Sequence, residues 1–289
     1  PVTEVEDAGP GPDRLLQRAK LVARAYGKNE SSFVKAWKAA PPLEEDSSHL
    51  ILPDPPWLAR HGDNVWIDPL ARIERLSGVA ANYKMIQVLT SEQFTPDRAT
   101  RWDRVARVSG NALLVCPARR ELILHLRHPK HAYGEHLHMV GGNFEPDHDN
   151  HNLVHTAIRE GLQETGLHFS PHRAPCLLMQ EEGTNWHMAV FLGVAVGREQ
   201  VDAMRAGLAA NTWNYAKDEG VPCPVKLDDL EAVMRRPMVP SCYMAICAWL
   251  LAGAPVDGQR GVVMRDGAAR ALAKRLIEHP AGPNFIKPA

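Results

Sequence analysis

The sequence has little net charge, few cysteines and no long hydrophobic run. Its 33 Lys and Arg residues nearly balance 34 Asp and Glu residues, which gives a formal net charge of −1 over 289 residues. Without an excess of positive charge, we expect no binding to nucleic acid or to an anionic membrane through bulk electrostatics. The apolar run near 244–256 is too short to span a bilayer, so it predicts a buried helix.

The five cysteines are odd in number, and none forms a C-x-x-C pair. This pattern predicts reduced thiols in a cytoplasmic protein. The first residues are acidic and lack the hydrophobic core of a signal peptide, which favours the same compartment. A hydrophobic content of 45% and a charged content of 23% are typical of a globular protein, and the length allows one large domain or two modest ones.

An acidic pair lies in the middle of the chain, within the segment Arg-Glu-Gly-Leu-Gln-Glu-Thr-Gly-Leu at residues 159–167. In a helix, Glu160 and Glu164 would project from one face, with their Cα atoms about 6 Å apart along the axis. Two carboxylates this close repel each other unless a cation lies between them, and oxygen ligands suit Mg²⁺ or Mn²⁺. The pattern predicts a cation site that could bind a diphosphate; the alternative is a solvated helix face, where the same spacing is common.

The segment resembles the Nudix box, whose pattern is G-x5-E-x7-R-E-U-x-E-E-x-G-U, with U an aliphatic residue. The matching residues are Gly142, Arg159, Glu160, Glu164, Gly166 and Leu167. The resemblance covers about residues 104–235 and implies an α+β fold, a Nudix-like α/β/α sandwich with a mixed sheet. It also implies metal-dependent hydrolysis of a nucleoside diphosphate linked to another group, with a small-molecule diphosphate as substrate and Mg²⁺ or Mn²⁺ as cofactor.

Several positions depart from the box. Gly161 occupies the first aliphatic position, and Gln163 replaces the first Glu of the E-E pair. The interval between the glycine and Arg159 is three residues longer than in the pattern, so the remaining Glu would fall on His148 or His151. These departures keep open a second function, a Nudix-fold module that binds a nucleotide without turnover.

The resemblance implies roles for individual side chains. Glu160 and Glu164 are expected to be direct metal ligands, and Gln163 could coordinate through its amide oxygen without adding charge. Arg159 is expected to orient Glu160 and a nearby carboxylate through charge-assisted hydrogen bonds.

A further carboxylate is expected from a loop late in the domain. Glu219, in Lys-Asp-Glu-Gly at 217–220, is the candidate for a general base or third metal ligand. The alternative is a solvated loop charge, and Glu181 and Glu182 at the end of a predicted strand are competing candidates.

Candidate substrate-binding residues surround the box. They are Arg127, His128, Lys130, Gly142, His148, His151, Trp213 and Tyr215. The first three follow a predicted strand and could contact a phosphate, or form a solvated turn. The two aromatic residues lie in a predicted loop and could stack on a base, or anchor the core.

Eleven of the 14 histidines fall between His125 and His187, which raises a third hypothesis, a His-rich metal-binding protein. His151 and His155 have the i, i+4 spacing of zinc ligands, but no nearby Cys or carboxylate completes a tetrahedral set. Contacts of these histidines with a phosphate or leaving group are the favoured interpretation.

Hydrophobic periodicity and turn residues predict the elements of the main domain. Strands are expected at 112–116, 121–127, 136–140, 176–181, 187–196 and 225–227, and helices at 152–165, 199–206, 227–235, 241–251 and 265–278. The glycine pair at 141–142 is expected to form a turn before the first of these helices.

The chain is expected to divide into three parts. Residues 1–103 form an N-terminal extension with a disordered start at 1–11 and helices at 12–26 and 31–40. Residues 104–253 form the Nudix-like domain, and 254–289 a C-terminal helix and tail. The extension could contribute to a homodimer interface.

Overall fold

The computed structural model describes residues 4–7, 49–53, 75–81, 105–131, 133–145, 148–150, 152–171, 177–181, 186–212 and 219–278. The described strands are β1 (Glu4–Asp7), β2 (His49–Pro53), β3 (Arg75–Ala81), β4 (Val105–Cys116), β5 (Glu121–Arg127), β6 (Leu137–His138), β7 (Val140–Asn143), β8 (Leu177–Glu181), β9 (Trp186–Ala195) and β10 (Gly220–Lys226). The described helices are η2 (Pro117–Arg119), α5 (Leu153–Thr165), α6 (Arg198–Ala209), η3 (Leu227–Asp229), α7 (Leu230–Val233), α8 (Pro240–Leu251) and α9 (Asp266–Glu278).

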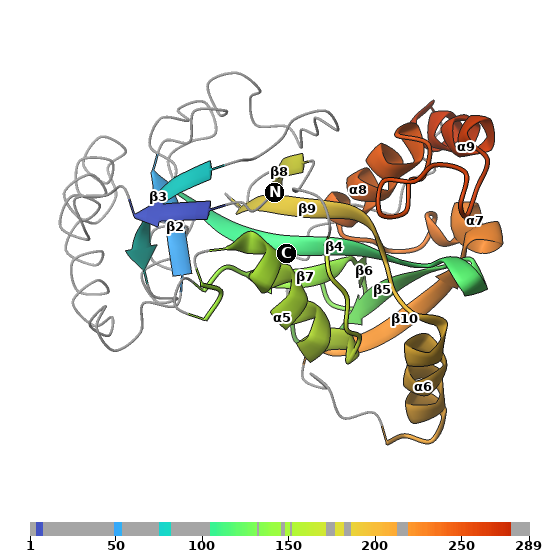
Figure 1. Cartoon of the computed structure of the whole chain (residues 1–289), viewed down its shortest axis with the longest axis horizontal. Helices are drawn as coiled ribbons and strands as arrows, with labels where there is room; N and C mark the ends of the chain where they lie inside the picture. Colours follow the sequence, from blue (N-terminus) through green and yellow to red (C-terminus); the bar gives the residue numbers. More distant parts are fainter. Residues whose placement is uncertain are drawn as a thin grey trace.

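A ten-stranded mixed sheet is the framework of the fold (Figure 1). Its main strand order is β1-β3-β2-β4-β5-β10, and β6, β7, β8 and β9 pair off this path. The long strand β4 pairs in parallel with β9 and antiparallel with β2, β5 and β7. β4 therefore brings together strands that are far apart in the sequence.

Successive side chains of the central strands point to opposite faces of the sheet and belong to two separate hydrophobic clusters. Leu113 and Val115 of β4 belong to one cluster, whereas Ala112 and Leu114 belong to the other, because successive strand residues point to opposite faces. Helices α7, α8 and α9 supply the first cluster, and α5 and α6 supply the second. The sheet thus lies between two helical layers, as Figure 1 shows for α8 and α9 on one side and α5 and α6 away from them.

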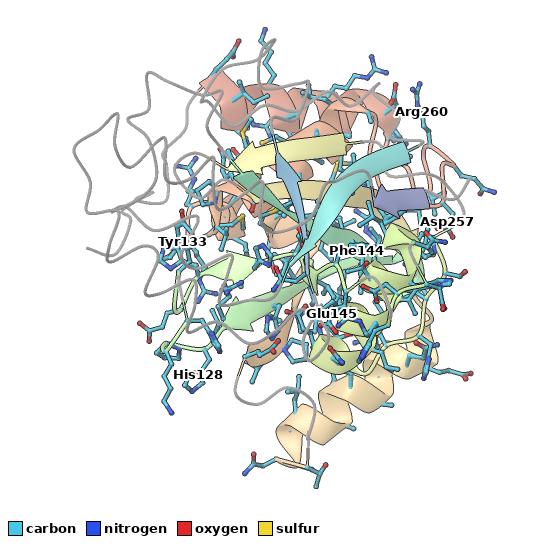
Figure 2. The ribbon with its side chains drawn as sticks, turned by 90° about the vertical axis from the view of Figure 1, so that its left-hand side faces the viewer. His128, Tyr133, Phe144, Glu145, Asp257 and Arg260 are labelled. Carbon is cyan, nitrogen blue, oxygen red and sulfur yellow. The ribbon has the colours of Figure 1, made fainter. Side chains whose placement is uncertain are left out.

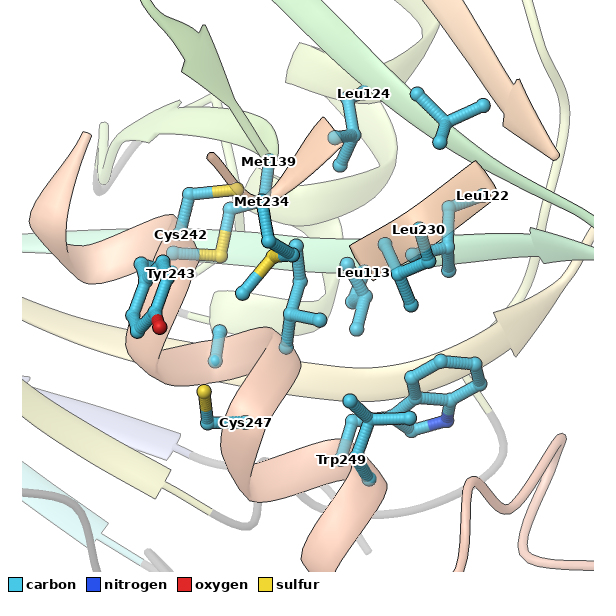
Figure 3. Packing of buried hydrophobic residues seen from close by; sticks show 14 of the residues in the cluster. Leu113, Leu122, Leu124, Met139, Leu230, Met234, Cys242, Tyr243, Cys247 and Trp249 are labelled. Atoms are coloured by element: carbon cyan, nitrogen blue, oxygen red, sulfur yellow. The ribbon is translucent and has the colours of Figure 1, made fainter. Parts of the chain in front are cut away.

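The larger cluster is built around α8. Figure 3 shows side chains of this helix, Cys242, Tyr243, Cys247 and Trp249 among them, in one cluster with Leu113, Leu122 and Leu124 of the sheet. Trp249 is fully buried, and its indole N–H donates to Pro255 O at 2.8 Å. Most residues of α8 are buried, and a helix covered on most sides has no strong amphipathic period. The apolar run at 241–251 is therefore a buried helix, as its sequence indicates.

The structure confirms the α+β class with a mixed sheet between helices. The strand predicted at 121–127 is β5, with the same bounds, and the helix predicted at 152–165 is α5. Among the described residues, no helix is long and apolar enough to cross a membrane. The predicted helices at 12–26 and 31–40 lie entirely outside the described residues.

Three expectations about the elements are wrong. The glycine pair at 141–142 is part of strand β7 rather than a turn. The strand predicted at 225–227 begins earlier, at Gly220, and includes Pro222 and Pro224. The N-terminal segment contributes strands β1, β2 and β3 to the sheet, so 4–7 is a strand and not disordered.

Candidate functional site

Helix α5 carries the acidic pair, and its two ends are fixed by its own sequence. The Asn152 side chain accepts a hydrogen bond from Val154 N at 3.0 Å, which caps the N-terminus. Gly166 ends the helix in the left-handed region at φ 65°, and its N–H donates to Leu162 O at 2.8 Å. The buried side of the helix contains Glu160 and Glu164, so both carboxylates face the interior.

Glu160 packs directly against the glycine strand β7. A Cβ at position 142 would lie 2.3–2.4 Å from the Glu160 carboxyl atoms, so any larger residue here would displace this carboxylate. Burial raises the pKa of Glu160 to about 7; the charge of Arg159 opposes this shift, whereas those of Glu219 and Glu145 add to it. Gly142 of the box therefore serves the close approach of a carboxylate.

Glu164 is more deeply buried, with 4% of its surface exposed. Its Oε2 accepts a hydrogen bond from Gly141 N at 2.9 Å, and its Oε1 lies 3.4 Å from Nδ1 of His125. Burial raises the pKa of Glu164 well above its ordinary value, and the charges of Glu160 and Glu219 raise it further. Burial also lowers the pKa of His125 to about 4, so this imidazole is neutral at neutral pH and does not form an ion pair with Glu164.

Arg159 lies at the centre of a hydrogen-bond network. Its Nε and Nη2 donate to the two carboxylate oxygens of Asp149 at 2.8 and 3.1 Å. Its Nη1 donates to Glu160 Oε1 at 2.8 Å, and its Nη2 also donates to Asn143 O at 2.8 Å. Arg159 thus holds Glu160 and a second carboxylate, which are the contacts that the resemblance implied, while its part in catalysis stays a prediction.

Sequence reasoning missed Asp149 and Glu145. Asp149 is fully buried and also accepts hydrogen bonds from Thr156 Oγ1 at 2.9 Å and Glu145 N at 2.8 Å. Glu145 Oε1 lies 3.4 Å from Arg159 Nη1. The fixed spacing of the box pointed to His148 and His151. Because the segment before the helix is longer here, Asp149, which does not fit that spacing, contacts Arg159 instead. The available signal was three acidic residues, Glu145, Asp147 and Asp149, between the glycine pair and Arg159.

The other predicted metal-site residues are more exposed. Glu219 is exposed, and its charge raises the pKa of both box glutamates, so its carboxylate acts on the same region. Its main-chain oxygen accepts a hydrogen bond from His128 N at 2.7 Å. Gln163 is exposed, and its Oε1 lies 3.5 Å from Arg159 Nη1. The side chain of Glu181 and all of Glu182 lie outside the described residues.

Within the part of the chain that the structure describes, no group of three or more His, Cys, Asp or Glu side chains forms a ready-made metal site. Two adjacent carboxylates with raised pKa values nevertheless fit a divalent cation, which would offset their mutual repulsion. Mg²⁺ usually keeps several waters and binds through one or two carboxylates, so this donor set suits it better than zinc.

The predicted substrate-binding residues that the structure describes differ in their distance from the acidic pair. Arg127 ends β5, and its positive charge lowers the pKa of Glu164, so it lies within electrostatic reach of the site. His128 and Lys130 follow in the turn after β5, and Figure 2 shows His128 and Tyr133 on the same side of the molecule, apart from Glu145. Exposed His148 places Nδ1 3.4 Å from Glu145 Oε2. His151, Trp213 and Tyr215 lie outside the described residues.

No protein-family model matches the chain, and no curated protein matches it. Among solved structures, the chain is similar to a NUDIX hydrolase from Nitrosomonas europaea, with 17% sequence identity and a TM-score of 0.33. The similarity covers 49% of this chain and 86% of that protein. A similarity this low identifies no function.

Proposed function

We propose that this protein is a divalent-metal-dependent hydrolase that cleaves the diphosphate linkage of a nucleoside diphosphate derivative. The observation that carries the proposal is the pair Glu160 and Glu164, which lie buried on one side of α5 against a strand whose Gly142 leaves space for the Glu160 carboxylate. Burying two carboxylates without a cation is unfavourable, and their raised pKa values express that cost. The same carboxylates are the oxygen ligands that Mg²⁺ or Mn²⁺ prefers.

Each residue of the site would have a distinct role in this reaction. Glu160 and Glu164 would hold the cation, and Arg159 keeps Glu160 in place through the hydrogen bond at 2.8 Å. A bound cation neutralises phosphate charge and lowers the pKa of bound water. Exposed Glu219 would accept a proton from water or complete the ligand set. Arg127 and the turn after β5 would contact the phosphates.

A nucleotide-binding module without turnover is the second candidate. It is favoured by two observations: Gln163 supplies no charge, and the described residues hold no complete set of three ligands. Both candidates place a nucleotide at the same site, so they are distinguished by whether product forms.

The experiment is an assay of nucleoside diphosphate derivatives with Mg²⁺, Mn²⁺ or EDTA. We expect product with either metal, none with EDTA, and a decrease in kcat/KM of about 100-fold or more for Glu164→Gln, because several kcal/mol of charge stabilisation is lost. The exposed Glu199 of α6 provides a matched control, and Glu199→Gln should retain full activity. Hydrolysis that persists in EDTA would contradict the proposal, and tight nucleotide binding without product would support the second candidate.

A further inference from the structure

His125 of β5 is a buried polar side chain that the proposed reaction does not yet use. It is 1% exposed, and neither Nδ1 nor Nε2 has a hydrogen-bond partner among the residues that the structure describes. A buried polar group without a partner is destabilising, and such groups are rare in native proteins. An apolar residue would pack here without that cost, so the imidazole calls for a functional explanation.

The ring lies between two parts of the candidate site. On one side, Nδ1 is 3.4 Å from Glu164 Oε1. On the other side is Gly220 of β10, next to Glu219: a Cβ at position 220 would lie 2.9 Å from Cε1 and 3.0 Å from Nε2 of the ring. The nearest atom to such a Cβ is Leu126 O at 2.1 Å, so the main chain already requires glycine here, and the absent side chain also leaves room for the imidazole beside Glu164.

The two oxygens of Glu164 have different environments. Oε2 already accepts a hydrogen bond from Gly141 N at 2.9 Å, whereas Oε1 has His125 Nδ1 at 3.4 Å, a few tenths of an ångström beyond an ordinary hydrogen bond. Donor and acceptor distances in catalytic sites often shorten when the ligand binds. A donor on each oxygen would fix the carboxylate plane and so the direction of its remaining lone pairs.

We propose that His125 is a positioning residue for Glu164: its imidazole donates Nδ1–H to Oε1 and holds the carboxylate in the orientation that binds a divalent cation. This inference rests on the proposed function, because it assigns Glu164 to a metal site. Hydrogen-bonded partners of carboxylate ligands are a general feature of metal centres, and their loss costs about 10–100-fold in metal affinity or activity.

A pair of variants of similar shape separates this role from packing. Asn places its amide nitrogen near the position of Nδ1, whereas Leu has a similar shape and no donor. The dissociation constant of Mn²⁺, measured by titration calorimetry, should rise about 10–100-fold in His125→Leu and stay close to that of the wild type in His125→Asn. If the ring only filled space, the more apolar Leu would bind Mn²⁺ at least as tightly as Asn.

A third variant covers a failure of His125→Leu to fold. Gln places its amide nitrogen nearer the position of Nε2, so His125→Gln should lose Mn²⁺ affinity although it keeps a polar group. His138 is the matched control, because it pairs with His125 across β5 and β6, is 5% exposed and also has an unpartnered Nδ1 in the described part of the chain. His138→Leu should leave Mn²⁺ affinity unchanged.

The outcomes distinguish this inference from the function on which it rests. Absence of Mn²⁺ uptake by the wild type would remove both the metal site and the role of His125. If the wild type binds Mn²⁺ while the Asn, Leu and Gln variants all bind it equally well, only the role of His125 is overturned. A loss in His138→Leu as large as that in His125→Leu would also overturn it.

Discussion

At the scale of single residues, the ion pair between Arg159 and Asp149 is the strongest structural feature of the site. Asp149 is fully buried and accepts two hydrogen bonds from the guanidinium group. Asp149→Asn keeps the shape but removes a buried carboxylate that accepts two charged hydrogen bonds from Arg159, which keeps Glu160 and Glu145 as partners, so we expect a loss of about 1.5–3 kcal/mol in the free energy of unfolding. Urea denaturation would measure it, with Asp229→Asn as an exposed control. A loss no larger than that of the control would show that the pair contributes little.

The pKa of Glu160 predicts a dependence of stability on pH. Burial raises this pKa from 4.5 in the unfolded chain to about 7 in the folded protein, so the folded state binds the extra proton between these values. In EDTA, the free energy of unfolding of the wild type should therefore fall as pH rises from 4.5 to 7, relative to Glu160→Gln, by on the order of 3 kcal/mol at most.

The comparison requires urea denaturation of both proteins at several pH values. Below pH 4.5 the carboxyl is protonated in both folded and unfolded states, so the pH-dependent part of the difference should vanish. Saturating Mg²⁺ should reduce the fall if the cation binds Glu160. A difference between the two proteins that does not change with pH would contradict the assigned pKa shift.

At the scale of elements, Gly161 shows how α5 fits the sheet despite departing from the box. The Phe169 ring fills the space that an aliphatic side chain would take: a Cβ at 161 would lie 2.2 Å from ring atom Cε1. Gly161→Ala should therefore destabilise the protein by about 1–3 kcal/mol, because overcrowding exceeds the gain in helix propensity of about 1 kcal/mol.

Two further variants test the cause of that loss. Phe169→Leu added to Gly161→Ala should recover part of the stability, because the smaller side chain makes room for the new methyl group. Gly267→Ala in α9, where nothing lies within 4 Å of the added Cβ, should be neutral or stabilising by up to about 1 kcal/mol. Thermal unfolding of the wild type and the three variants would give the order of their stabilities. Equal losses of stability in Gly161→Ala and Gly267→Ala would contradict crowding as the cause.

The elements differ in how well the sequence predicts them, for physical reasons. α5 has an N-cap, a C-terminal glycine and a helical period, so its bounds follow from local interactions. β10 contains Pro222 and Pro224, which normally argue against a strand. β10 ends the main strand order and pairs with β5, a place where proline is tolerated because its missing N–H faces away from the ladder.

Hydrophobic periodicity predicts that Leu153, Ala157, Ile158 and Leu162 pack α5 onto the sheet, and this prediction is partly wrong. Ile158 and Leu162 are only half-buried, whereas the buried positions include Glu160, Gly161 and Glu164. Hydrophobic periodicity assigns carboxylates to the solvent side by default, and it fails where two of them face the interior. The contacts of Arg159 with Asp149 and of Glu164 with His125 depend on tertiary structure, so spacing along the chain could not predict them.

At the scale of the whole molecule, the predicted boundary at 253 can be tested against the core. Helix α9 buries Ala269, Leu272, Ala273 and Leu276 in the same cluster as α8. The Tyr243 hydroxyl also donates to Leu276 O at 2.8 Å. Removing residues 254–289 would expose this side of α8, and burial of each large apolar side chain is worth about 1.5–3 kcal/mol against a total stability of about 5–15 kcal/mol.

We therefore expect the fragment 1–253 to lose cooperative unfolding, measured by urea denaturation and near-ultraviolet circular dichroism. A smaller change tests the same packing within the full chain: Leu276→Ala should cost about 2–5 kcal/mol, whereas Ile277→Ala, at a side chain 49% exposed, should cost little. If 1–253 unfolded cooperatively with the stability of the full chain, α9 would be an appendage, as the sequence division assumes. If it does not, the sheet against which α5 packs Glu160 and Glu164 is stabilised by a helix far from them in the sequence.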